Sequence, residues 1–157
     1  MTDTEGTHRG TKYTFPKLPV AAALVALLGL VDSIYLTVHH YNATPVPCGA
    51  AFDCEMVLTS GYAELAGIPL AAFGAVAYFA AFSLALLTSF GDRRMWKLFG
   101  LLVIPMAAFS GWLIYVQAAV IGAFCQFCLI SAATTATLLV IYLVSSFLKP
   151  KTDPSPV

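Results

Sequence analysis

The segment Phe124-Cys125-Gln126-Phe127-Cys128-Leu129 places a Cys-x-x-Cys pair where a long apolar segment of the chain resumes. At a helix start this spacing lets the two sulfurs close a small disulfide ring, and the unpaired amides of the first turn favour a thiolate. Because thiol–disulfide exchange proceeds through the thiolate, such a pair can open and close reversibly. The alternative is two small cysteines that simply pack among helices. A second pair, Cys48 and Cys54, favours redox chemistry.

The composition around this pair is that of a membrane protein. The chain has 157 residues, of which 59% are hydrophobic and 10% charged, whereas soluble proteins average roughly 25% charged residues. Four apolar segments approach the roughly 20 residues that cross a hydrocarbon core. They run over about Leu18–His39, Ile68–Phe90, Trp96–Val120 and Gln126–Leu148. The sequence therefore predicts an all-α integral membrane protein, a bundle of four transmembrane helices.

The basic residues predict how the bundle is oriented. All eight Lys and Arg lie before the first span, between the second and third, or after the fourth: Arg9, Lys12, Lys17, Arg93, Arg94, Lys97, Lys149 and Lys151. By the positive-inside rule, both termini are cytoplasmic, and the connections that contain the four cysteines face outward. We expect cytoplasmic tails at 1–17 (disordered) and 149–157, and a membrane domain at 18–148 in the inner (plasma) membrane. Nothing in the sequence suggests nucleic-acid binding.

The outward connection at about 40–67 is the longest loop and is rich in apolar residues, including Phe52, Met56 and Leu58. A solvated linker has no need of so much apolar surface. We expect this segment to lie across the mouth of the bundle as a lid. Asp53 is a suitable N-cap for a short helix over Cys54–Ser60.

Asp32 is a carboxylate inside the first predicted span. It shares a helix face with Tyr35 and His39, because the three lie at i, i+3 and i+7. A carboxylate at this depth costs a few kcal/mol unless it is satisfied. One interpretation is that Asp32 and His39 form a proton route to a substrate near the outer surface. The other is that Asp32 is a packing carboxylate that is hydrogen-bonded to a neighbouring helix.

Two aromatic residues, Trp112 and Tyr115, lie toward the outer end of the third span. Such residues anchor helices at the membrane–water interface. They could also form the wall of a pocket for a flat ring.

Four cysteines allow three disulfide connectivities. The arrangement favours Cys48–Cys54 and Cys125–Cys128 as resting pairs, with a cross-pair as a transient intermediate. The loop pair can reach soluble proteins, whereas the helix pair lies at a depth that a lipid-soluble two-electron acceptor can reach laterally. This division predicts a thiol:quinone oxidoreductase, with a ubiquinone- or menaquinone-type acceptor and no metal.

The order of these residues resembles the vitamin K epoxide reductase family in its bacterial form. The resemblance rests on Cys48, Cys54, Ser60, Gly67-Ile68-Pro69 and Cys125-Gln126-Phe127-Cys128, and covers about Leu18–Leu148. It implies a four-helix bundle around a quinone. Many bacterial members carry a fused thioredoxin-like domain. Since this chain ends soon after Leu148, we expect its partner to be a separate periplasmic or extracellular thioredoxin-fold thiol oxidase.

The resemblance also implies roles for individual residues. Cys48 would exchange with a partner's thiol, and Cys54 would pass electrons on through a transient disulfide with Cys125. Cys128 would lie closest to the quinone as the reactive thiolate. Ser60 would help to hold the lid or the quinone pocket.

This chain departs from the vertebrate members at two polar positions. Ala132 stands where they have a Tyr four residues after the last cysteine, and Leu70 where they have an Asn early in the second helix. A site that loses such polar contacts loses discrimination, so plain quinone reduction is favoured over epoxide reduction. Phe124, beside Cys125, completes the residues expected to support the quinone.

Two other functions remain open from the sequence. One is a vitamin K epoxide or quinone reductase that uses external dithiols. The other is a non-enzymatic membrane scaffold or transporter whose disulfides only staple its outer face, with Asp32 as the functional residue. A four-cysteine zinc site is disfavoured, because Cys48 and Cys54 are farther apart than the usual ligand pair.

Overall fold

The computed structural model describes residues 17–147. The expected tails before and after these residues lie outside the described part, except Lys17, which begins the first helix. The elements, in chain order, are α1 (Lys17–Tyr41), α2 (Cys54–Leu58), β1 (Glu64–Leu65), β2 (Ile68–Pro69), α3 (Leu70–Ser89), α4 (Arg93–Val116), the π-helical segment η1 (Gln117–Ile121) and α5 (Gln126–Phe147).

Four helices are long and apolar enough to cross a membrane: α1, α3, α4 continued through η1, and α5. The predicted four-helix membrane bundle is confirmed. The starts of the second and third predicted spans differ from the structure by two and three residues. The third helix begins at Arg93, three residues before Trp96, because Asp92 caps it by accepting a hydrogen bond from the Arg94 amide at 3.0 Å. The second begins at Leu70, because Ile68 and Pro69 form a strand.

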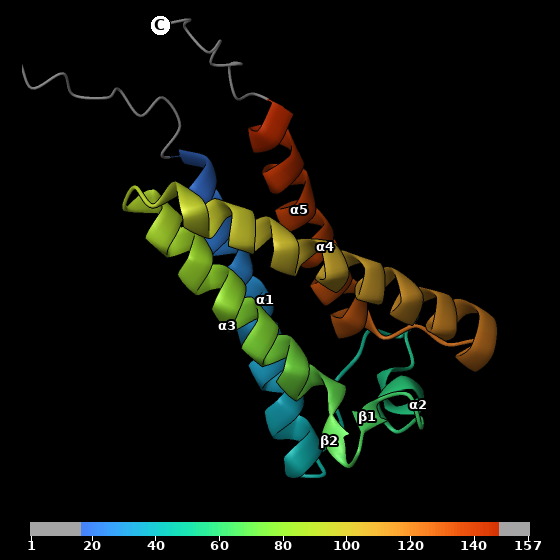
Figure 1. Ribbon diagram of the computed structural model, residues 1–157. Coiled ribbons are helices and arrows are strands. Elements are labelled where there is room, and N and C mark those ends of the chain that lie inside the picture. The colour runs from blue at the N-terminus through green and yellow to red at the C-terminus, as the bar shows by residue number, and fades with distance from the viewer. Residues whose placement is uncertain (1–16, 148–157) are drawn as a thin grey trace, which may run out of the picture.

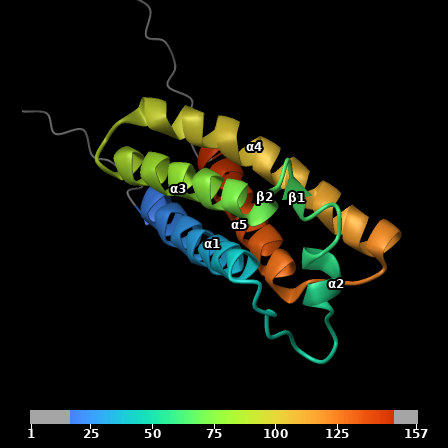
Figure 2. The ribbon, with the colours of Figure 1, turned by 90° about the horizontal axis from the view of Figure 1, so that it is seen from below.

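The four long helices pack in a ring in which α1 contacts α3 and α5, and α4 contacts the same two helices (Figures 1 and 2). Small residues allow α1 and α3 to lie close together. The buried core of the bundle consists of Ala22, Ala23, Ala26, Tyr78, Ala81, Ala85, Trp96, Phe99, Val103 and Leu138. Many large apolar side chains lie on the outside of the bundle, as expected where a helix faces lipid.

The connection from α1 to α3 gathers at one end of the bundle, where α2 lies beside the start of α5 and the β1–β2 hairpin lies at the start of α3 (Figures 1 and 2). We call residues 42–69 the outer loop. His40 Nε2 lies 3.2 Å from Glu64 Oε1, so this contact joins the end of α1 to β1.

The β1–β2 hairpin is an element that the sequence analysis missed. Glu64 pairs with Pro69 and Leu65 with Ile68. The two turn residues, Ala66 and Gly67, both have positive φ, 54° and 79°. Positive φ at both central positions is typical of the tight hairpin turn that matches strand twist.

Candidate active site

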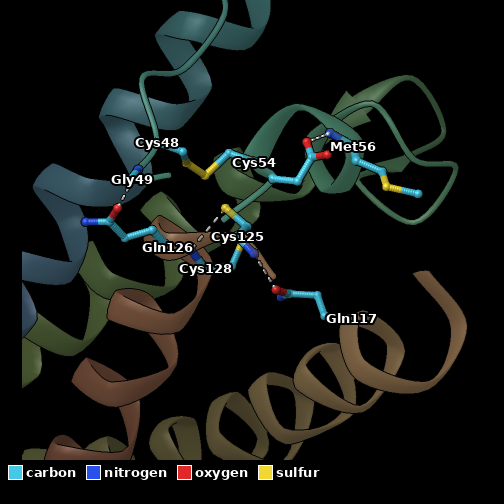
Figure 3. Close-up of a disulfide and its surroundings, with 9 residues drawn as sticks. Cys48, Gly49, Cys54, Met56, Gln117, Cys125, Gln126 and Cys128 are labelled. Atoms are coloured by element: carbon cyan, nitrogen blue, oxygen red, sulfur yellow. Dashed lines mark hydrogen bonds between the residues drawn. A yellow bond between two sulfur atoms is a disulfide. The ribbon is translucent and has the colours of Figure 1, made fainter. Parts of the chain in front are cut away.

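Both cysteine pairs meet at the end of the bundle that carries residues 42–69 (Figure 3). Cys48 and Cys54 form a disulfide with their Cα atoms 6.1 Å apart. Cys54, Val57 and Cys125 make a small buried cluster, against which Cys48 and Cys128 pack. Cys54 is 1% exposed and Cys125 0%, whereas Cys48 is partly exposed. One sulfur of the loop disulfide is therefore accessible from outside, and the other lies against the helix pair.

Cys125 stands at the N-cap of α5. Its carbonyl oxygen accepts the Leu129 amide at 3.0 Å, and its sulfur accepts the Cys128 amide at 3.4 Å, as the side chain of an N-cap residue does. A hydrogen bond from the Cys128 thiol, together with the amides of Cys128 and Phe127, lowers the pKa of Cys125 against the opposing effect of burial. The helix start thus favours a thiolate on Cys125.

The expected second resting disulfide is not formed in this structure. Cys125 and Cys128 are both free thiols, so that prediction is wrong for this state of the protein. The hydrogen bond of the Cys128 amide to the Cys125 sulfur stabilises the open pair in place of the covalent bond.

Two hydrogen bonds hold the outer loop against the start of α5. The Gly49 amide donates to Gln126 Oε1 at 3.1 Å (Figure 3), and the Asp53 amide donates to the Phe124 carbonyl at 3.0 Å. The Asp53 carboxylate accepts the Met56 amide at 3.0 Å, so its predicted role as N-cap is confirmed. The helix ends at Leu58 rather than Ser60, because Thr59 is already its C-cap.

A buried glutamine at the end of α4 holds Cys125 from the other side. Gln117 is 3% exposed, and its Oε1 accepts the Cys125 amide at 2.9 Å (Figure 3). It is the first residue of the π-helical segment, a local widening that often occurs at functional sites. This role of Gln117 was not predicted from the sequence. A single amide side chain in an otherwise apolar span was the available signal.

A cavity of about 780 Å³ lies between the outer loop and the long helices. Cys128 lines it, as do Ser60, Leu70 and Ala132. The lining is mostly apolar, and the cavity reaches the helices α1, α3, α4 and α5. Leu70 and Ala132, the two positions that the resemblance singled out, therefore both line the cavity.

The inner part of the cavity has a polar group that the sequence analysis did not single out. Tyr78, 2% exposed, donates its hydroxyl hydrogen to the Ser131 carbonyl at 2.6 Å. The same oxygen lies 2.6 Å from Thr135 Oγ1. All three residues line the cavity. The hydrogen bonds between Tyr78 on α3 and Ser131 and Thr135 on α5 satisfy their polar groups.

Three of the residues expected near the quinone do not line this cavity. Trp112 and Tyr115 lie on the outer surface of α4, 47% and 63% exposed, which is typical of interface residues. Trp112 packs edge-on against Tyr62, with ring centres 6.4 Å apart. Phe124 lines a separate small groove beside Asp53 and Met56.

The expected proton-route residues occupy different places. His39 lines the cavity, and Thr44 Oγ1 lies 2.9 Å from its Nδ1. Tyr35 packs between His39 and Phe127, with ring centres 4.3 and 5.3 Å away. Asp32 does not line the cavity. Its Oδ2 is buried and has no hydrogen-bond partner within residues 17–147, so no neighbouring helix satisfies this oxygen.

In this membrane bundle, two cysteine pairs meet beneath the outer loop. This arrangement is typical of a membrane oxidoreductase that works by thiol–disulfide exchange. The comparison with known families agrees. The model of the vitamin K epoxide reductase family matches residues 20–143, so the chain belongs to this family and the resemblance seen in the sequence is confirmed. Members of the family are multi-pass membrane proteins that use quinones as electron acceptors.

Proposed function

We propose that this protein is a thiol:quinone oxidoreductase that supports disulfide-bond formation. It would take two electrons from a reduced thioredoxin-fold partner and pass them through its two cysteine pairs to a quinone of the ubiquinone or menaquinone type. The observation that carries the proposal is the buried cluster in which Cys54 of the loop pair packs with Cys125 of the helix pair. This contact is required for a disulfide between the two pairs.

The first exchange would take place at Cys48, the accessible sulfur of the loop disulfide. A partner thiolate attacks Cys48, the Cys48–Cys54 bond breaks, and Cys54 leaves as a thiolate. The partner's second thiolate then attacks the partner sulfur of the mixed disulfide and releases Cys48. The partner is oxidised to its disulfide, and the loop pair becomes a dithiol.

The second exchange would connect the two pairs of this chain. With the helix pair as a disulfide, the Cys54 thiolate attacks Cys125 and releases Cys128. Cys48 then attacks Cys54, which restores the Cys48–Cys54 disulfide and releases Cys125. Cys125 leaves readily because its pKa is lowered by hydrogen bonds at the start of α5. The described state, with the loop pair closed and Cys125 and Cys128 reduced, corresponds to the end of this step.

The cavity next to Cys128 supports a quinone as the final acceptor. Its volume of about 780 Å³ suits a ring with part of a hydrophobic chain. When bound, a quinone supplies a two-electron acceptor that takes up the two electrons and two protons of the dithiol. Leu70 and Ala132 offer no polar contact from their positions on the cavity wall, which supports plain quinone reduction over epoxide reduction.

The charge pattern supports an outward-facing site in the inner (plasma) membrane, with both termini in the cytoplasm. The segment with Cys48 and Cys54 contains no Lys or Arg from His39 to Gly67, and the segment with Cys125 and Cys128 contains none between Lys97 and Lys149. A thiol partner would therefore come from the periplasm or the cell exterior.

A proton route through His39 and Asp32 is part of the proposal. His39 lines the cavity and is partly exposed, so it would connect the route to water. Asp32 has a buried oxygen without a partner within residues 17–147, which is consistent with a carboxyl group that changes protonation during turnover.

The test is a purified-protein assay that follows quinone absorbance with a reduced thioredoxin-fold protein as donor. Cys128→Ala should abolish quinone reduction, whereas Cys48→Ala should block oxidation of the protein donor. Quinone turnover that survives Cys128→Ala contradicts the proposal.

A second experiment separates the enzyme from a disulfide-stapled scaffold. In a variant lacking Cys48 and Cys128, Cys54 and Cys125 should form a disulfide with each other, because their side chains pack together. Failure to recover this disulfide would favour the scaffold.

A further inference from the structure

The side chain of Gln117 has two ends with different surroundings. One end accepts the Cys125 amide at 2.9 Å. A backbone N–H can only donate, so the group that faces it must be the carbonyl oxygen Oε1 and not the NH₂ group. The orientation of the amide is thereby fixed, and Nε2, with its two hydrogens, points away from Cys125.

Nε2 makes no hydrogen bond to any residue in the described range 17–147. Within residues 17–147, the one fully buried side-chain oxygen or nitrogen without a hydrogen-bond partner is Asp32 Oδ2. Nε2, which also has no partner, is therefore not fully buried. Gln117 as a whole is 3% exposed and lines the cavity together with Cys128. The unpaired donor therefore belongs to a residue of the cavity wall.

Two other hydroxyl groups of the cavity wall already donate to backbone carbonyls. The Tyr78 hydroxyl donates to the Ser131 carbonyl at 2.6 Å, and the Ser60 hydroxyl donates to the Val57 carbonyl at 2.6 Å. An acceptor atom of a bound molecule would find a free donor in Gln117. Since a buried NH₂ group without a partner costs free energy, an acceptor at this place stabilises both groups.

We propose that Gln117 Nε2 donates a hydrogen bond to a ring carbonyl oxygen of the quinone while Gln117 Oε1 holds the amide of Cys125. One side chain thus binds the acceptor and fixes the start of α5 next to Cys128. The inference rests on the proposed function, because it takes the cavity as the quinone site. It assigns the polar contact that Leu70 and Ala132 do not provide.

The experiment measures binding of menadione to the oxidised protein, and the infrared bands of menadione labelled with ¹³C at one carbonyl at a time. Gln117→Met removes both hydrogen bonds. It should raise the Kd about tenfold and return one of the two carbonyl bands to its position in free menadione. A general loosening of the site would not act on one labelled carbonyl alone.

Gln117→Glu separates the two functions of the side chain. A carboxylate still accepts the Cys125 amide, but it offers no donor, so Kd and the carbonyl band should change as in Gln117→Met. The rate of Cys54–Cys125 exchange should fall in Gln117→Met and stay near wild type in Gln117→Glu. The spectra are compared at a pH where the introduced carboxyl shows its ionised bands. Should Gln117→Met fail to fold, Gln117→Glu decides by the same readouts.

Gln126→Met is the matched control, because Gln126 is an amide beside the same cysteines but bonds to Gly49 and does not line the cavity. It should leave the menadione Kd and both carbonyl bands unchanged. Unchanged Kd and bands in the Gln117 variants overturn this inference alone. A wild-type protein that does not bind menadione overturns the quinone proposal as well.

Discussion

At the scale of single residues, the site consists of a sulfur held in place by a helix start. Cys125 is completely buried, and yet its surroundings favour the charged form. The Cys128 thiol and two first-turn amides donate to its sulfur and lower its pKa, while Gln117 holds its own amide at 2.9 Å. Burial alone would have the opposite effect on a thiol.

The lowered pKa of Cys125 leads to a prediction on pH. The thiolate of the reduced protein should appear below the ordinary thiol value of about 8.5. Cys128→Ala removes the main donor, so the midpoint of thiolate absorbance at 240 nm should move to higher pH. Cys48 and Cys54 do not interfere while they remain a disulfide.

The wild-type titration belongs to the Cys125/Cys128 pair, so its first step is the quantity to compare. Because the folded-state pKa is lowered, ionised Cys125 also stabilises the fold at pH above the unfolded value, and this contribution is lost as pH falls through the folded value. A midpoint that stays the same or falls in Cys128→Ala contradicts the assignment.

The cysteines of the site could be predicted from the sequence, whereas the roles of Gln117 and Tyr78 were not, since each has at most a weak signal there. Cys-x-x-Cys is a local pattern whose spacing carries its chemistry. A single Gln or Tyr in an apolar span has no such pattern, and its role depends on the helix that happens to pack opposite. Trp112 and Tyr115 show the converse, because the sequence could not tell which face of α4 lies on the cavity.

At the scale of elements, α2 is a short helix that presents Cys54 to the helix pair. Five residues are too few for a helix to persist by itself. Its cap, through the Met56 amide and Asp53 Oδ1, and the Asp53–Phe124 backbone hydrogen bond hold it in place. The position of the Cys54 sulfur therefore depends on Asp53.

Replacing this cap should disturb the loop pair specifically. Asp53→Ala should destabilise α2 by about 1 kcal/mol, which corresponds to roughly fivefold faster hydrogen exchange in residues 54–58. Formation of the Cys54–Cys125 disulfide should slow in parallel in a variant without Cys48 and Cys128.

Asp53→Asn is the control, since Asn caps helices about as well as Asp and should leave both rates near wild type. If Asp53→Ala also leaves both rates unchanged, α2 is held by packing alone.

The helix α2 was predicted because the sequence has a local signal for it, whereas the β1–β2 hairpin has no such signal and was not predicted. Asp53 predicted α2, because an N-cap residue needs a side-chain oxygen that can accept a backbone hydrogen bond. The β1–β2 hairpin has two residues in each strand and an Ala-Gly turn, in place of the Asn-Gly or Asp-Gly that usually marks such a turn. Pro69 was expected inside α3, but the pairing of β2 delays the helix by two residues.

At the scale of the whole molecule, the ring of four helices leaves a cavity under the outer loop and brings all four cysteines to one end. The number and approximate length of the transmembrane helices could be predicted from hydropathy, because the thickness of the bilayer sets the length of a helix that crosses it. Which helices are neighbours did not follow, since the helices are apolar on most sides and offer no one-sided pattern.

The orientation of the bundle can be tested by labelling. In a cysteine-free background, Thr59→Cys should react with a membrane-impermeant maleimide in intact cells, because residue 59 is exposed in the outer loop. Asp92→Cys, exposed in the basic turn at the other end, should react only after the cells are permeabilised. The reverse pattern would place the cysteines in the cytoplasm and contradict the proposed partner.

The complete burial of Cys125 has a consequence for the lifetime of the protein. Peroxides convert accessible thiolates to sulfenic acid and then, irreversibly, to sulfinic acid. A thiol with a lowered pKa is the most susceptible kind, but the Cys125 sulfur has no surface open to water. The packing that brings Cys54 to Cys125 also shields the latter from oxidative damage, so we expect Cys125 to survive many catalytic cycles without repair.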